Sequence, residues 1–189
     1  MSTLGPSGGR AVASADGLPR LVAPLATILV RTGDAYGSGR FGASRDGGKR
    51  RHEGVDLVAA VGDTVIAPIA GRVIPFDPYG RDPAKAGRFS AVQIDSADGW
   101  RVRLLYLDTG AIAWGMRVVS GAFLGRVQDL SLIYPPRAVG RMTPHIHFDL
   151  RPFDPASGRV GAPVDPTPLL DRWRADVAAT RPAGASAQP

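Results

Sequence analysis

The sequence predicts a mainly β fold: a compact antiparallel β-sandwich or open barrel with one short C-terminal helix. Three observations support this prediction. Short runs of β-branched residues recur along the chain. Turn residues separate these runs, because 24 glycines and 17 prolines are spread over the 189 residues. Only one longer segment carries apolar residues at helical spacing, and it lies near the C-terminus.

The strands are expected in order along the chain. Residues 21–30 are apolar and are interpreted as the first strand, because Pro24 and the lack of a small-residue cleavage site argue against a signal peptide. Residues 54–58 are β-branched and hold few strong helix formers, which favours a second strand. Further strands are expected at residues 64–66, 71–74, 91–95, 100–107 and 116–119.

The helical segment covers residues 168–179. It begins with Pro168, which suits the first turn of a helix. Its apolar residues share one face, so we expect the helix to pack on the sheet. These residues are Leu169, Leu170, Trp173 and Val177.

The chain is expected to form one domain over residues 19–180. Residues 1–18 carry too little apolar surface to order themselves and are predicted to be a disordered leader. Residues 181–189 are rich in proline, alanine and serine and are predicted to be a flexible tail. Two long loops, residues 76–88 and 130–144, are expected to act as walls or lids of a site.

The composition narrows the classes of function. No cysteine is present, which excludes a disulfide framework and a thiolate metal site. The formal net charge of +6 favours polyanionic surroundings, such as nucleic acid, an anionic lipid surface or an acidic cell-wall polymer. The charge comes from scattered arginines without a dense basic run, so it does not choose among these. No segment is long enough to span a membrane.

All three histidines lie in two short motifs, one from His52 to Asp56 and one from His145 to His147. Residues two apart leave the same face of a strand, and residues four apart share a face on a strand or a helix. Imidazole and carboxylate are the ligands that zinc takes where thiolate is absent. The pattern therefore predicts one zinc ion held by His52, Asp56 and one of the paired histidines, with an open fourth position as in catalytic zinc sites.

These motifs resemble those of the lysostaphin-like (LytM-type) zinc metalloendopeptidases, which cut peptide cross-bridges in bacterial cell walls. The resemblance runs from about residue 37 to 170. It implies an antiparallel β fold with a groove and zinc on the floor of the groove. It is carried by residues 39–45, 51–57, 62–68, 70–73, 115–121, 145–151 and 164–166.

The resemblance implies roles for individual residues. His52, Asp56 and His147 would hold one Zn²⁺ per chain, and His145 would act as acid or base beside the nucleophilic water. The family usually carries a further histidine in a Tyr-x-His pattern, and Tyr106 stands in its place here. A phenol can donate to an oxyanion but is a poor base near neutral pH. We therefore expect Tyr106 to be an oxyanion donor or a groove-wall residue without a mechanistic role.

Asp149, two residues past His147, is interpreted as a charge on an edge strand, and orientation of an imidazole is the alternative. Glu53 follows a ligand but points away from it on a strand, so we expect it to be exposed to solvent.

Two functional hypotheses follow. The first is a zinc metalloendopeptidase that hydrolyses peptide bonds of bacterial peptidoglycan. The alternative is a catalytically inactive zinc-binding module that binds cell wall or a protein partner, because a subgroup resembling leukocyte cell-derived chemotaxin also lacks the histidine. Under both hypotheses the partner is peptidoglycan or a protein, and no nucleic-acid partner is expected. The target is expected in the cell envelope or outside the cell. The setting stays open between a phage tail component, an exported autolysin and a component of a larger envelope machine. The lack of an evident signal peptide favours phage-encoded delivery, holin-type release or an incomplete start, without choosing among them.

Overall fold

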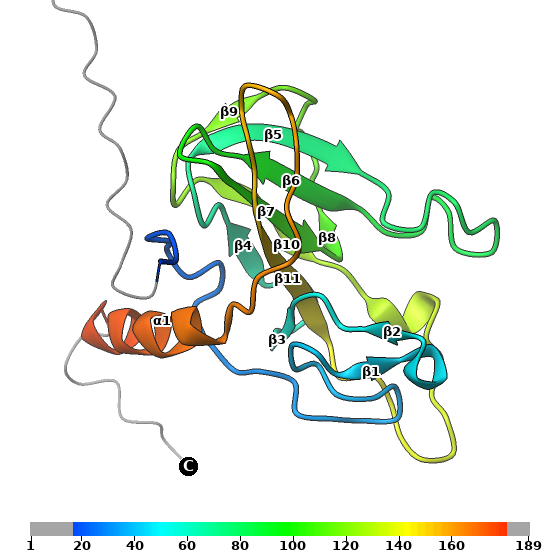
Figure 1. Cartoon of the computed structure of the whole chain (residues 1–189). Coiled ribbons are helices and arrows are strands. Elements are labelled where there is room, and N and C mark those ends of the chain that lie inside the picture. The colour runs from blue at the N-terminus through cyan, green and yellow to red at the C-terminus, as the bar shows by residue number, and fades with distance from the viewer. Residues whose placement is uncertain (1–16, 181–189) are drawn as a thin grey trace, which may run out of the picture.

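Three antiparallel sheets and one α-helix make up most of the computed structural model, which describes residues 17–180 (Figure 1). The largest sheet has six strands in the order β3-β11-β7-β6-β5-β9, and two smaller sheets have the orders β4-β10-β8 and β1-β2. The predicted mainly β fold with one C-terminal helix is confirmed. The strands are β1 Ser44–Arg45, β2 Arg50–Arg51, β3 Val55–Val58, β4 Thr64–Ile66, β5 Gly71–Phe76, β6 Ala91–Asp95, β7 Trp100–Leu105, β8 Leu107–Asp108, β9 Arg117–Val118, β10 Phe123–Val127 and β11 His145–Pro152; the helices are η1 Asp46–Gly48, η2 Leu130–Leu132 and α1 Thr167–Thr180.

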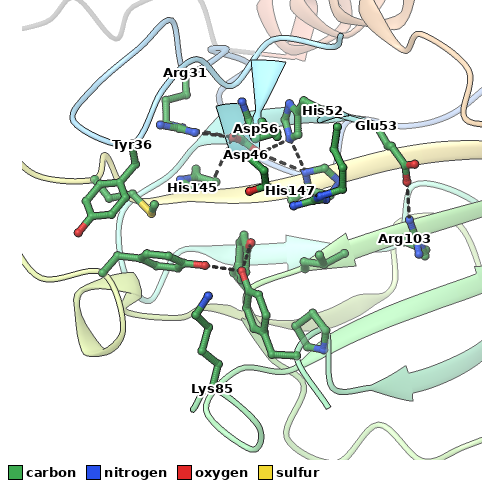
Figure 2. Close-up of a pocket in the computed structure, with 18 of the residues that line it drawn as sticks. Arg31, Tyr36, Asp46, His52, Glu53, Asp56, Lys85, Arg103, His145 and His147 are labelled. Atoms are coloured by element: carbon green, nitrogen blue, oxygen red, sulfur yellow. Dashed lines mark hydrogen bonds and ion pairs between the residues drawn. The ribbon is translucent and has the colours of Figure 1, made fainter. Parts of the chain in front are cut away.

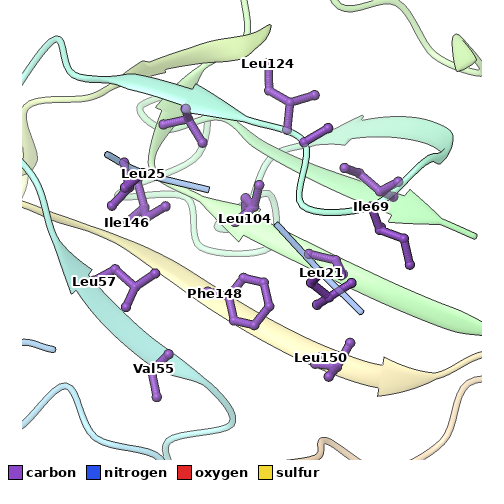
Figure 3. Packing of buried hydrophobic residues seen from close by; sticks show 14 of the residues in the cluster. Leu21, Leu25, Val55, Leu57, Ile69, Leu104, Leu124, Ile146, Phe148 and Leu150 are labelled. Carbon is purple, nitrogen blue, oxygen red and sulfur yellow. The ribbon is translucent and has the colours of Figure 1, made fainter. Parts of the chain in front are cut away.

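The six-stranded sheet has one apolar face and one polar face. Along β11, Ile146, Phe148 and Leu150 are fully buried in the hydrophobic core (Figure 3). The residues that alternate with them, His145, His147 and Asp149, point to the opposite face because side chains alternate along a strand. The core face therefore fixes which residues of β11 reach the site.

The core face is covered by the β4-β10-β8 sheet, by α1 and by the segment that precedes β1. Val65 of β4 and Leu124 of β10 are fully buried in the same cluster. Trp173 of α1 is also fully buried, and its indole Nε1 donates to the carbonyl of Leu21 at 2.8 Å. Its ring meets the edge of Phe148 with the ring centroids 5.2 Å apart. The helix thus ties the two ends of the described chain to the sheet.

Residues 21–30 do not form the predicted strand. The segment consists of bends and has a single bridge, from Val30 to Leu57. Pro24 has no N–H to donate to a ladder, which explains the interruption. The apolar side chains are nevertheless used, because Leu21, Leu25 and Ile28 belong to the core.

The predicted strand at residues 100–107 is divided in two. Tyr106 has φ 72°, a left-handed conformation that breaks the β ladder between β7 and β8. The chain passes there from the six-stranded sheet to the β4-β10-β8 sheet. The short β1-β2 hairpin and β10 were not expected from the sequence.

The helix is confirmed as α1. Thr167 begins it, and the carboxylate of Asp165 accepts a hydrogen bond from the Thr167 N–H at 2.9 Å. Of the predicted leader only Gly17 and Leu18 are described, and Leu18 is buried in the core; the predicted tail lies outside the described residues. No helix among residues 17–180 has the length and apolar character needed to cross a membrane.

Replacement of Trp173 by alanine is expected to lower the free energy of unfolding by about 3–5 kcal/mol, because it removes a fully buried aromatic ring and its hydrogen bond. Trp114 provides a matched control, since its side chain is 67% exposed. Trp114→Ala should cost less than about 1 kcal/mol. Urea unfolding followed by circular dichroism measures both. Equal effects of the two substitutions would contradict the role of α1 in the core.

Candidate metal centre

The strand register brings two candidate ligands together. In the antiparallel pair of β3 and β11, Asp56 lies directly opposite His147. Opposed residues on one face of such a pair have their Cβ atoms within about 5.5 Å. His145 lies two residues earlier on the same face of β11. The convergence is therefore a consequence of sheet pairing and needs no loop to create it.

His52 reaches the same point from outside the sheet. It lies in the connection between β2 and β3 and not on a strand. The connection crosses close to β11 at Gly54, where an added Cβ would overlap the carbonyl oxygen of Phe148 and lie 2.9 Å from the Cβ of Asp149. Glycine at this position allows the close approach that turns His52 back over the sheet.

The three expected ligands present their donor atoms to one point (Figure 2). His52 Nε2 lies 2.9 Å from His147 Nδ1, and each of these nitrogens lies 3.1 Å from Asp56 Oδ1. Ligands of a tetrahedral zinc ion with bonds of about 2.0–2.1 Å are separated by about 3.3 Å. The donor set and its spacing fit a zinc ion, and all three residues are buried.

The outer nitrogens of both imidazoles have partners that set the ring orientation. His52 Nδ1 donates to the carbonyl of Arg40 at 2.9 Å, which turns Nε2 toward the centre. His147 Nε2 lies 3.5 Å from Asp149 Oδ2. Such contacts between an imidazole and a carboxylate or carbonyl fix ligand tautomers in metal sites.

Asp149 is not the edge-strand charge that was predicted. β11 lies between β3 and β7, and Asp149 is fully buried. Its carboxylate accepts from Arg103 Nε at 2.8 Å and from Arg151 Nε at 3.3 Å. The alternative interpretation, that Asp149 orients His147, is the one that agrees with this geometry. Glu53 is 54% exposed, as expected.

The cluster attracts positive charge. Burial disfavours a charged imidazole, but the carboxylates of Asp149 and Asp56 outweigh it and raise the pKa of His147 to about 9. Asp56 shows the converse: burial opposes its ionisation, and hydrogen bonds from His147 and His52 still hold its pKa well below the usual range. A divalent cation at this point would take the place of the proton.

A buried arginine holds the second oxygen of Asp56. Arg31 donates to Asp56 Oδ2 from Nη2 at 2.8 Å and from Nε at 3.2 Å, while Oδ1 faces the imidazoles. The other arm of the guanidinium lies 2.7 Å from Asp34 and donates to the carbonyl of Gly37 at 2.8 Å. Arg31 thus leaves one carboxylate oxygen free to serve as a ligand. Arg31 was not predicted from the sequence as a site residue.

His145 lies beside the cluster and outside it. Its Nδ1 donates to the carbonyl of Thr143 at 2.7 Å, and its Nε2 lies 3.7 Å from Asp56 Oδ2. Burial lowers the pKa of His145, although the charge of Asp56 opposes the shift. The side chain is therefore a neutral imidazole whose unprotonated Nε2 faces the cluster.

Tyr106 lies next to His145, with the ring centroids 5.5 Å apart and the ring planes perpendicular. Its hydroxyl lies 2.8 Å from the hydroxyl of Tyr79. Burial raises the pKa of Tyr106, so the phenol remains protonated at neutral pH and can only donate or accept hydrogen bonds.

A groove of about 440 Å³ contains all the predicted site residues: His52, Asp56, Tyr106, His145 and His147. Its walls include the β1-β2 hairpin and parts of the two long loops, which contribute Tyr79, Lys85 and Tyr134. In Figure 2 the imidazoles meet at Asp56 and Lys85 points into the groove from the opposite wall.

Arg31→Met is expected to destabilise the metal-free protein by roughly 3 kcal/mol, the lower end of the range for breaking a buried ion pair. The lower end applies because protonated His147 can still compensate part of the charge of Asp56. Arg51→Met is the control, since Arg51 lines the same groove but is exposed. Denaturant unfolding in the presence of a chelator measures both. A loss for Arg31→Met no larger than that for Arg51→Met would show that the ion pair does not support the fold.

Comparison with known proteins finds relatives with similar sequences. The chain is 33% identical over 127 residues to Myeloid protein 1 of Gallus gallus, covering 65% of this chain and 35% of the relative, so it spans about one third of that protein's length. It is 29% identical over 139 residues to Leukocyte cell-derived chemotaxin-2 of Bos taurus, covering 69% of this chain and 83% of the relative.

Among solved structures, the antimicrobial peptidase lysostaphin from Staphylococcus simulans has the same fold. It superposes with a TM-score of 0.51 at 20% identity, over 89% of this chain and 61% of lysostaphin. The family model described as Peptidase family M23 matches residues 50–166, more than half of the chain and including both histidine motifs. The chain belongs to Peptidase family M23.

Proposed function

We propose that the protein is a zinc metalloendopeptidase that hydrolyses peptide bonds of bacterial peptidoglycan. The observation that carries this proposal is the convergence of His52, Asp56 and His147 on one point, with a neutral His145 beside it on the floor of a groove. A cell-envelope or extracellular target accords with the resemblance to lysostaphin-like enzymes.

His52, Asp56 and His147 would hold one zinc ion, which supplies Lewis acidity and lowers the pKa of water near it. His145 Nε2 is free to accept a proton, and the hydrogen bond from Nδ1 to Thr143 keeps the ring in that tautomer. The second task is to stabilise negative charge on the carbonyl oxygen of the scissile bond. Tyr106 would serve it by donating a hydrogen bond from its phenolic O–H.

A second candidate is a zinc-stabilised module that binds cell wall or a protein partner without catalysis. The observation that favours it is Tyr106, a tyrosine where the lysostaphin-like pattern has a histidine. The similarity to Leukocyte cell-derived chemotaxin-2 points in the same direction. Both candidates require the metal centre, so metal content is tested first and hydrolysis second.

The purified chain is expected to retain about one zinc per molecule after dialysis, measured by elemental analysis. His52→Ala should lose it, because only two of the three protein ligands would remain. His145→Ala is the matched control: it also removes a buried imidazole of the groove, but His145 lies outside the three-atom cluster, so zinc should stay bound. Zinc retained by His52→Ala, or lost from His145→Ala, would contradict the assigned ligands.

The zinc-loaded protein is expected to release new free amines from purified cell walls. His145→Ala with zinc still bound should be slower by about 10²–10⁴-fold, the usual contribution of a general acid or base. Tyr106→Phe removes a single donor and should also reduce kcat. Walls of different cross-link chemistry are needed as substrates. No amine release from any of them, with zinc present, would favour the non-catalytic module.

A further inference from the structure

All four tyrosines of the chain lie in the groove that holds the metal centre. They come from four separate segments: Tyr36 precedes β1, Tyr79 lies between β5 and β6, Tyr106 between β7 and β8, and Tyr134 follows η2. Tyr36 and Tyr134 meet edge to face with ring centroids 5.3 Å apart. Segments distant in sequence thus build one aromatic wall beside the site.

The hydroxyls of Tyr79, Tyr106 and Tyr134 are linked by two hydrogen bonds, which leave one O–H donor unused. The hydroxyl of Tyr79 lies 2.8 Å from that of Tyr106 and 2.6 Å from that of Tyr134. Each phenol carries one proton, and each of the two hydrogen bonds uses one. In every arrangement of the protons, one of the three O–H groups is left to donate outside the chain.

The hydroxyls remain protonated. Burial raises the pKa of Tyr79, Tyr106 and Tyr134, so none of them becomes a phenolate near neutral pH. The cluster therefore offers the groove a neutral donor and no negative charge.

Lys85 adds a positive charge at the same wall. Its Nζ lies 5.1 Å from the ring centroid of Tyr79 and 5.6 Å from that of Tyr134. Its ion pair with Asp82, at 3.4 Å, is between side chains that are 32% and 41% exposed. Exposed pairs of this kind are weak, so the ammonium can turn to a ligand.

The charge of the groove agrees with an anionic ligand. Six arginine and lysine side chains line it, against three aspartate and glutamate side chains. Arg45 and Arg51 of the β1-β2 hairpin contribute to this excess. Arg31 and Arg103 are also paired with Asp34 and Asp149 outside the lining, so Lys85 and the hairpin arginines are the cations left for a ligand.

We propose that Lys85 and the hydroxyls of Tyr79, Tyr106 and Tyr134 form a subsite for a carboxylate of the bound peptide. An ionised carboxylate only accepts hydrogen bonds, which matches a wall that supplies an ammonium and an unused O–H. The edge contact of Tyr106 with His145 places the subsite next to the metal centre. The inference rests on the proposed function in taking a peptide as the ligand.

The test compares short peptides that differ in one charge. Acetyl-Ala-Ala-Ala with a free C-terminus, its C-terminal amide, and acetyl-Ala-Glu-Ala-amide are titrated into the zinc-loaded chain and followed by NMR. At least one carboxylate peptide is expected to bind about tenfold more tightly than the neutral amide, a difference of about 1.4 kcal/mol. Acetyl-Ala-Ala-Ala tests whether the subsite takes a C-terminal carboxylate, and acetyl-Ala-Glu-Ala-amide tests whether it takes a side-chain carboxylate.

Lys85→Gln should remove the preference, and Tyr134→Phe should reduce it, with unchanged thermal unfolding midpoints. Arg88→Gln is the matched control, because Arg88 is an exposed cation of the same loop that does not line the groove. It should keep the tenfold preference. Equal binding of all three peptides by the wild type, or a preference that survives in Lys85→Gln, would overturn the proposal.

The same spectra report cleavage, which separates the subsite from the peptidase activity. Carboxylate-selective binding without cleavage of these peptides or of cell walls would support the subsite and contradict the peptidase. Cleavage without a preference for carboxylate peptides would support the peptidase and contradict the subsite. If the chain is active, Lys85→Gln should raise KM for the carboxylate peptide and leave kcat nearly unchanged.

Discussion

The pairing of β3 with β11 is the constraint on which the site depends, because it sets Asp56 opposite His147. The same register buries Leu57 and Phe148 on the other face of the sheet. A slip by one residue would exchange the faces, bringing Ile146 into the groove and His147 into the core. The free energy of the apolar core therefore also holds two of the candidate metal ligands, Asp56 and His147, in place.

The buried charges of Asp56 and His147 are compensated by direct partners and by the partners of those partners. Asp56 faces the imidazoles with one oxygen and Arg31 with the other, and Asp149 holds His147 from behind while it is itself held by Arg103. A carboxylate buried without such partners would be costly. Arg31 precedes the segment that matches the M23 family, residues 50–166, so part of the support for the candidate ligand Asp56 comes from outside the matched region.

Local patterns in the sequence were sufficient for much of the fold, and the residues they indicated for the candidate site lie together in one groove. Residues 64–66 and 91–95 form strands with the predicted bounds, because alternating apolar residues between turns determine them locally. Arg31 was missed because its partner lies 25 positions away and only the tertiary fold joins them. Asp149 was predicted to lie on an edge strand, but β11 is a central strand. The order of strands in a sheet cannot be inferred from the sequence of a single strand.

The backbone at position 106 bears on how members of this family diverge. Tyr106 has φ 72°, a conformation that histidine adopts more readily than most bulky residues. The turn between β7 and β8 would thus accept either side chain without rearrangement of the sheets. A single substitution at this position would therefore exchange a phenol for an imidazole beside His145 while both sheets keep their arrangement.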